Sequence, residues 1–133
     1  MLEKIRKPIL FQGNLHKSDY FEGWYFKQVS VDQRVSLSFI PGVSLNAGDK
    51  HSFIQYILVE TDEREQKKTH TGYVKYNMAD FSYQEEPFMI KIGESIFSES
   101  KISIDLTDER FHFRGELELG ELHEPFIEWF FKN

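Results

Sequence analysis

Polar and apolar residues alternate with a period of two along much of the chain, and no segment shows the period of 3.6 residues typical of an amphipathic helix. The clearest alternation is Phe111–Leu119, where odd positions are apolar or glycine and even positions are polar or charged. The segment 101–106 alternates in the same way. Residues 107–110 between them predict a hairpin turn. We therefore expect two antiparallel strands, each with one buried and one solvated face.

Two further regions predict strands nearer the N-terminus. In Val35–Phe39 apolar residues alternate with serine, and Pro41–Gly42 is expected to end that strand. Asp32–Gln33 separates it from Trp24–Val31 and predicts another hairpin. His51–Thr61 differs because both of its alternating faces are largely apolar. This pattern is typical of a strand that is covered on both sides.

Shorter segments complete the set of predicted strands. They are Gly72–Tyr76, Phe81–Glu85, Phe88–Ile92 and Glu94–Phe97. The charged segment Thr61–His70 is interpreted as a solvated loop. The fold class is therefore all-β, an antiparallel meander of about eight or nine strands, and a meander of that number commonly closes into a barrel. We expect residues 1–133 to form a single barrel domain, of a size that holds one small ligand.

Composition and charge narrow the classes of function. The net charge of −6 argues against a nucleic-acid partner, because phosphate binding needs a basic surface. There is no cysteine, so disulfide and thiolate chemistry are excluded. The sequence shows neither the apolar run of a signal peptide nor a membrane span, and a cytoplasmic location is expected. Aromatic residues are 16% of the chain, which indicates an unusually aromatic core or an apolar ligand.

One aromatic segment, YFEGWYFK at Tyr20–Lys27, contains a single carboxylate. The string F-E-G-W-Y-F-K at Phe21–Lys27, preceded by Phe11-Gln12-Gly13, resembles the N-terminal signature of the tocopherol cyclase family. The resemblance covers the first half of that family's longer chains. It implies a lipocalin-like β-barrel and ligands of the prenylated hydroquinone kind.

Cyclisation of such a quinol needs an acid that protonates the alkene of the prenyl tail, and apolar walls that exclude water. A carboxylic acid in an apolar pocket stays protonated near neutral pH because burial raises its pKa. Aromatic faces stabilise the resulting cation. Glu22 is therefore the first candidate for the acid and Asp19 the second. The candidate ligand-binding residues are Trp24, Tyr25, Phe26, Phe39, Phe53 and Tyr56.

A structural role competes with each of these assignments. Glu22 could cap one end of the barrel or pair with Arg34 or Lys27 without touching a ligand. Trp24 could plug the barrel floor, as a tryptophan after glycine does near the first strand of lipocalins. Gly23 would then permit a close approach of two backbones.

The remaining residues predict no cofactor. The five histidines form no H-x-H or H-x-x-x-H pair, so no metal site is predicted. No phosphate-binding loop and no G-x-S-x-G motif occurs. Three functions stay open: a cyclase, a carrier that binds a hydrophobic small molecule unchanged, and a structural domain. In the third, the apolar end Phe126–Asn133 would dock a second domain or a second copy of the chain.

Overall fold

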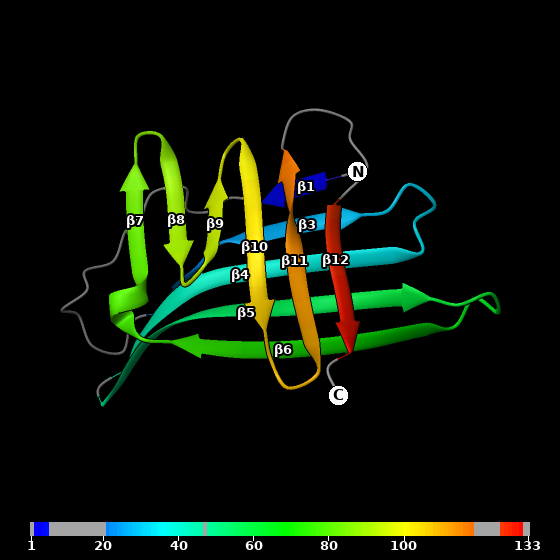
Figure 1. The fold of residues 1–133 in the computed structure, drawn as a ribbon, viewed down its shortest axis with the longest axis horizontal. Coiled ribbons are helices and arrows are strands. Elements are labelled where there is room, and N and C mark those ends of the chain that lie inside the picture. The colour runs from blue at the N-terminus through cyan, green and yellow to red at the C-terminus, as the bar shows by residue number, and fades with distance from the viewer. Residues whose placement is uncertain (1, 6–20, 47, 119–125, 132–133) are drawn as a thin grey trace.

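The computed structural model describes residues 2–5, 21–46, 48–118 and 126–131, which form two antiparallel sheets (Figure 1). Sheet A has the strand order β1-β3-β4-β5-β6, and the short β2 also pairs with β4. Its strands are β1 (Leu2–Ile5), β2 (Phe21–Gly23), β3 (Tyr25–Val29), β4 (Val35–Asn46), β5 (Asp49–Thr61) and β6 (Lys67–Tyr76).

Sheet B contains the second half of the chain in the order β12-β11-β10-β9-β8-β7. Its strands are β7 (Phe81–Glu85), β8 (Phe88–Ile92), β9 (Ser95–Ser98), β10 (Lys101–Thr107), β11 (Phe111–Glu118) and β12 (Phe126–Phe131). A single turn of 3-10 helix, η1 (Met78–Asp80), leads from sheet A into sheet B. Each strand of sheet B pairs with its neighbour in the chain, so the predicted meander is confirmed there.

The two sheets stack face to face, with the strands of sheet B running crosswise over those of sheet A (Figure 1). The prediction of an all-β, antiparallel chain is confirmed. Among the described residues no strand pairing joins sheet A to sheet B, so a closed barrel is not observed. Nor does this part of the chain contain a helix long and apolar enough to cross a membrane.

The core fills the space between the sheets. The burial of β10 alternates along its whole length, as the period of two predicts, so every second residue of that strand points into the core. Aromatic and branched aliphatic side chains from both sheets make one buried cluster: Trp24, Phe26, Leu37, Phe39, Ile54, Tyr56, Leu58, Phe88, Ile90, Ile92, Phe97, Ile102, Ile104, Leu106, Phe111 and Phe113.

The prediction that Pro41–Gly42 ends a strand is wrong. Strand β4 continues through both residues to Asn46 and pairs with β5 along its full length. Pro41 is tolerated because the ladder loses only the hydrogen bond that its missing N–H would donate. Gly42 is required because a Cβ there would collide with the backbone oxygen of Glu22 and lie 2.6 Å from the Phe53 ring. The glycine permits close packing here and makes no turn.

The charged segment Thr61–His70 is also more ordered than predicted. Only Asp62–Gln66 forms the tip of a hairpin, and β6 begins at Lys67. The apolar C-terminal segment pairs through Phe126–Phe131 with β11 as the edge strand β12 of sheet B.

Candidate functional site

The aromatic motif lies along strand β4 in a single unbroken register. Gly23 is opposite Gly42 in β2, and Phe26 is opposite Phe39 in β3. The interruption between β2 and β3 falls at Trp24, whose N–H donates to the carbonyl oxygen of Pro41 at 2.9 Å. Because Pro41 has no backbone N–H, it cannot donate a hydrogen bond to β2 or β3 at this point, and the chain stays extended with one hydrogen bond fewer.

This register places Glu22 and Trp24 on the inner face of sheet A, because residues two apart in a strand share a face. Glu22 is 5% exposed and Trp24 is 1% exposed. The indole ring stacks on Tyr83 at 5.8 Å between centroids and lies 6.2 Å from Phe88. Residues of β7 and β8 therefore cover this end of the interior. The motif therefore places a buried carboxyl group on the inner face of sheet A, two residues from a tryptophan that packs between the sheets.

Three of the other candidate ligand-binding residues lie deeper in the core. The Phe26 ring stacks on Phe97 at 5.3 Å. Phe39 meets Phe113 edge-on at 5.7 Å, and the Tyr56 ring lies 4.7 Å from the same phenylalanine. Phe26, Phe39 and Tyr56 therefore pack against the side chains of sheet B and stabilise the contact between the sheets.

The last two candidate ligand-binding residues lie on the other side of sheet A. The Tyr25 hydroxyl is 3.1 Å from the Ser38 hydroxyl, and Phe53 stacks on Tyr73 at 4.8 Å. The structure thus divides the predicted group between the two faces of one sheet, so a single pocket between the sheets cannot contact all six side chains. Asp19, the second candidate acid, lies outside the described residues.

The basic residues considered as partners of Glu22 lie elsewhere. Arg34 precedes β4, nine residues from Val43, the position opposite Glu22, and forms an ion pair with Glu65 at 3.1 Å. Lys27 is on the outer face of sheet A because it alternates with Phe26. Neither basic residue lies beside Glu22 on the inner face.

Sequence reasoning missed a polar cluster that ties the two sheets together. The Tyr56 hydroxyl in β5 donates a short hydrogen bond to Asp108 Oδ2 in the β10–β11 hairpin. Asp108 Oδ1 accepts the backbone N–H of Arg110 at 2.8 Å and that of Phe111 at 2.8 Å. The Arg110 guanidinium donates to the carbonyl oxygen of Thr71 in β6 and lies 5.7 Å over the Phe111 ring.

The cluster raises the pKa of Tyr56 and lowers the pKa of Asp108. Burial, reinforced by the carboxylate of Asp108, raises the pKa of Tyr56 to about 12. Burial alone would raise the pKa of Asp108, but the hydrogen bonds from Tyr56 and from two backbone N–H groups bring it below its ordinary value. The cluster is therefore a neutral phenol held by an ionised carboxylate. The aspartate at the predicted turn was the only signal for it in the sequence.

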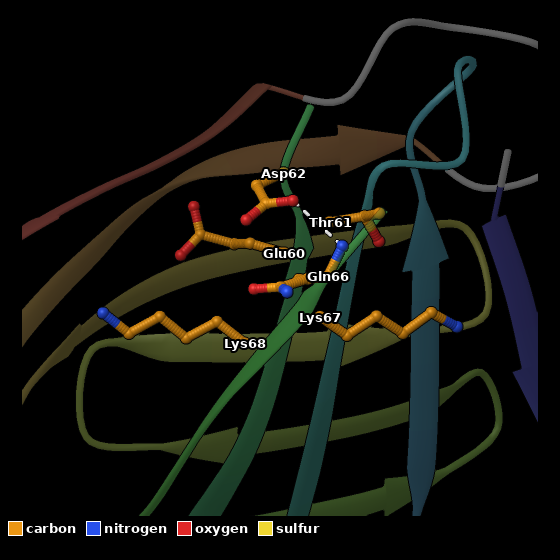
Figure 2. Close-up of a pocket in the computed structure, with 6 residues that line it drawn as sticks. All are labelled: Glu60, Thr61, Asp62, Gln66, Lys67 and Lys68. Carbon is orange, nitrogen blue, oxygen red and sulfur yellow. Dashed lines mark hydrogen bonds between the residues drawn. The ribbon is translucent and has the colours of Figure 1, made fainter. Parts of the chain in front are cut away.

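A hollow of about 560 Å³ lies at the β5–β6 hairpin. It is lined by Glu60, Thr61, Asp62, Gln66, Lys67 and Lys68. Two of these residues carry a carboxylate and two carry an ammonium group. Figure 2 shows the ammonium ends of Lys67 and Lys68 pointing away from each other. The Asp62 carboxylate accepts the backbone N–H of Arg64 and that of Gln66, at 2.8 and 2.9 Å. These contacts shape the turn and bring no set of like charges together.

Comparison of the chain with family models, with curated proteins and with solved structures finds no match. In the part of the chain that the structure describes, no group of three or more histidine or acidic residues is placed to hold a metal ion. The candidate site consists of the buried Glu22 and the aromatic residues around Trp24.

Proposed function

We propose that this chain is a tocopherol cyclase-like protein that binds a prenylated quinol, or a similar isoprenoid, at the Glu22–Trp24 end of the space between its sheets. In this proposal the two sheets are the walls of a lipocalin-like β-barrel, and the protein acts in the cytoplasm. The observation that carries the proposal is the 5% exposure of Glu22 on the same face as Trp24. Carboxyl groups are rarely buried in proteins, and one placed beside aromatic side chains can serve as an acid.

The proposed reaction uses Glu22 as the acid. Its carboxylic proton is transferred to the less substituted carbon of the prenyl double bond, leaving a tertiary carbocation. The phenol oxygen attacks that cation and closes the chromanol ring, and the phenolic proton returns to the carboxylate. Trp24, with Tyr83 stacked on it, supplies aromatic faces that stabilise the positive charge. The reaction needs no cofactor.

The proposed set of binding residues differs from the six candidates expected from the sequence. Trp24 is kept as a proposed binding residue, whereas Phe26, Phe39 and Tyr56 belong to the packed core between the sheets. Tyr25 and Phe53 are not among the proposed binding residues, because they lie on the outer face of sheet A. Tyr83 and Phe88 are added in their place because both rings contact Trp24.

A carrier that leaves its ligand unchanged is the second candidate function. It is favoured by the Tyr83 and Phe88 rings around Trp24, because an apolar aromatic lining can bind a ligand without any reaction. The docking of a second domain or a second copy through Phe126–Asn133 remains a third proposal. The position of β12 at the edge of sheet B supports it, because an edge strand has backbone groups that can pair further.

The test is an anaerobic incubation of the purified chain with a geranylgeranylated hydroquinone, followed by mass-resolved chromatography. Ring closure conserves mass, so a change in retention time with loss of one free phenol identifies the chromanol. We expect product with the native chain, none above background with Glu22→Gln, and undiminished product with the control Glu60→Gln on the β5–β6 hairpin.

The other outcomes separate the alternatives. Saturable quenching of tryptophan fluorescence by the quinol, without a product, would support the carrier and overturn the cyclase. Equal turnover by Glu22→Gln would remove Glu22 from the acid role. No binding and no product would overturn both proposals.

A further inference from the structure

The outer face of sheet A holds a second hydrogen-bonded group, centred on a buried histidine. His51 Nε2 in β5 lies 2.8 Å from the Tyr73 hydroxyl in β6. His51 Nδ1 lies 3.0 Å from the backbone carbonyl oxygen of Asp49. A carbonyl can only accept, so in the neutral imidazole Nδ1–H donates to Asp49 and the lone pair of Nε2 accepts the Tyr73 proton. The backbone thus fixes the tautomer in which Nε2 is a base.

The surroundings hold this pair in place and leave the tyrosine accessible. His51 is buried, whereas Tyr73 is 46% exposed. The Tyr73 ring stacks on Phe53 at 4.8 Å, and the His51 ring meets it edge-on at 5.9 Å. The Asp49 carboxylate lies 3.5 Å from His51 Nδ1 and pairs with Lys75 at 3.0 Å. A hydroxyl on a half-exposed ring, an oriented base and a group that orients the base are the parts of an activated nucleophile.

A hollow of about 390 Å³ adjoins His51 and Lys75. Two lysines and two aspartates are among the residues that line it: Asp49, Lys50, His51, Lys75, Tyr76, Asn77 and Asp80. Because these formal charges balance, the hollow favours a substrate without net charge. Lys75 lies two residues beyond Tyr73 on the same face of β6, and its ammonium group pairs with the Asp49 carboxylate.

We propose that Tyr73 is a nucleophile that accepts acyl groups from uncharged activated esters, with His51 as its general base. The Tyr73 oxygen attacks the ester carbonyl while its proton passes to His51 Nε2. The tetrahedral intermediate collapses, the bond to the leaving aryl oxide breaks, and that oxide takes the proton from His51. The products are O-acyl-tyrosine and the free phenol, and no further reactant is consumed.

The need for a base follows from the surroundings of the tyrosine. Burial and the nearby Asp49 carboxylate raise the pKa of Tyr73, so its hydroxyl is protonated at neutral pH and must lose its proton during attack.

This site is independent of the proposed cyclase. Glu22 shares the inner face with Val43, whereas His51 is opposite Ser44, the next residue of β4. The sheet therefore separates the two groups.

The chain supplies its own comparison for the test. Tyr25 lies on the same face of sheet A, but its hydroxyl is bonded to Ser38, which is not a base. The full chain is incubated with p-nitrophenyl acetate at neutral pH, and acetylation of each tyrosine is followed by peptide mass spectrometry. Since general-base catalysis contributes about 10²-fold or more, we expect Tyr73 to acquire the acetyl group about 10²-fold faster than Tyr25. In His51→Gln the rate at Tyr73 should fall to that of Tyr25.

Two controls keep the result interpretable. The rate at Tyr25 should be the same in His51→Gln as in the native chain, which shows that the variant is folded. Tyr73→Phe keeps the ring stacked on Phe53 and removes only the hydroxyl, so it should abolish the fast release of p-nitrophenolate. Equal acetylation of Tyr73 and Tyr25, fast release that persists in Tyr73→Phe, or acetylation of Lys75 in place of Tyr73 would overturn the proposal.

Discussion

Two tyrosines on neighbouring strands of sheet A illustrate how differently its two faces use aromatic hydroxyls. Tyr56 in β5 faces sheet B, is fully buried, and donates its proton to Asp108. Tyr73 in β6 faces outward, is 46% exposed, and is bonded to His51. Both rings are held by aromatic neighbours, Tyr56 by Phe113 and Tyr73 by Phe53. The difference lies in the group that accepts each hydroxyl proton.

That difference decides what each hydroxyl can do. The Asp108 carboxylate is stabilised by two backbone N–H groups and Tyr56, which bring its pKa below the ordinary value despite burial. It therefore binds the Tyr56 proton weakly, and the hydrogen bond serves to hold the sheets together. An imidazole is a far better base near neutral pH. The hydroxyl of Tyr56 thus contributes to the contact between the sheets, whereas the hydroxyl of Tyr73 has an imidazole as its partner.

The largest expected effect tests whether the inner face carries the stability. Phe97 is fully buried and stacks on Phe26 at 5.3 Å. Phe97→Ala would remove a ring from the middle of the contact between the sheets and leave a cavity. We expect the free energy of unfolding to fall by about 3–5 kcal/mol, measured by urea denaturation. The matched outer variant, Tyr73→Ala, should lose only about 1 kcal/mol, because its ring is half exposed. Equal losses would mean that the two faces are packed alike.

A smaller effect is expected where the outer face is itself tightly packed. A Cβ at Gly42 would collide with the backbone of Glu22 and with the Phe53 ring, so Gly42→Ala must displace β2 or Phe53. We expect a loss of about 1–3 kcal/mol, typical of overpacking. The control is Gly23→Ala, whose Cβ would meet its nearest neighbours at 3.3 Å and should cost less. A Gly42→Ala protein as stable as Gly23→Ala would show that β2 can move freely.

Much of the fold could be predicted because the period of two is a local signal. The bounds of β7 and β8 agree with the predicted Phe81–Glu85 and Phe88–Ile92, and the β10–β11 hairpin follows from the alternation on either side of its turn. The end of β4 could not be predicted in this way. Whether Pro41–Gly42 breaks a strand depends on Phe53 and Glu22, which approach Gly42 only in the folded sheet.

The candidate sites were harder to predict for a related reason. Alternation places Glu22 and Trp24 on one face and separates Phe53 from Tyr56, yet it could not show which of those two shares a face with Phe39 in the neighbouring strand. That assignment needs the register between strands. The pairing of Tyr56 with Asp108 and of His51 with Tyr73 likewise joins residues that are distant in sequence. No local pattern carries such contacts.

The smallest expected effect concerns the hydrogen bond on the inner face. Tyr56→Phe removes one hydroxyl from Asp108 and keeps the ring against Phe113, so we expect a loss of about 1 kcal/mol near pH 7. Because the pKa of Asp108 is lowered in the folded state, its stabilisation is present above the ordinary carboxyl pKa of about 4 and is lost as the pH falls through the folded value. Because the pKa of Tyr56 is raised to about 12, its stabilisation is present below about pH 10 and declines as the pH rises towards 12.

The difference in unfolding free energy between the native chain and Tyr56→Phe should therefore be greatest between about pH 5 and pH 9 and shrink on both sides of that range. Urea denaturation at about pH 3, 7 and 10.5 measures it. Tyr25→Phe is the control, because the Tyr25 hydroxyl is bonded to Ser38, which does not titrate, and its effect should not change between pH 3 and pH 7. A Tyr56→Phe difference that is constant across this range would mean that Tyr56 and Asp108 are not linked in solution. The two tyrosines of sheet A would then differ only in exposure, and not in the group that holds the proton.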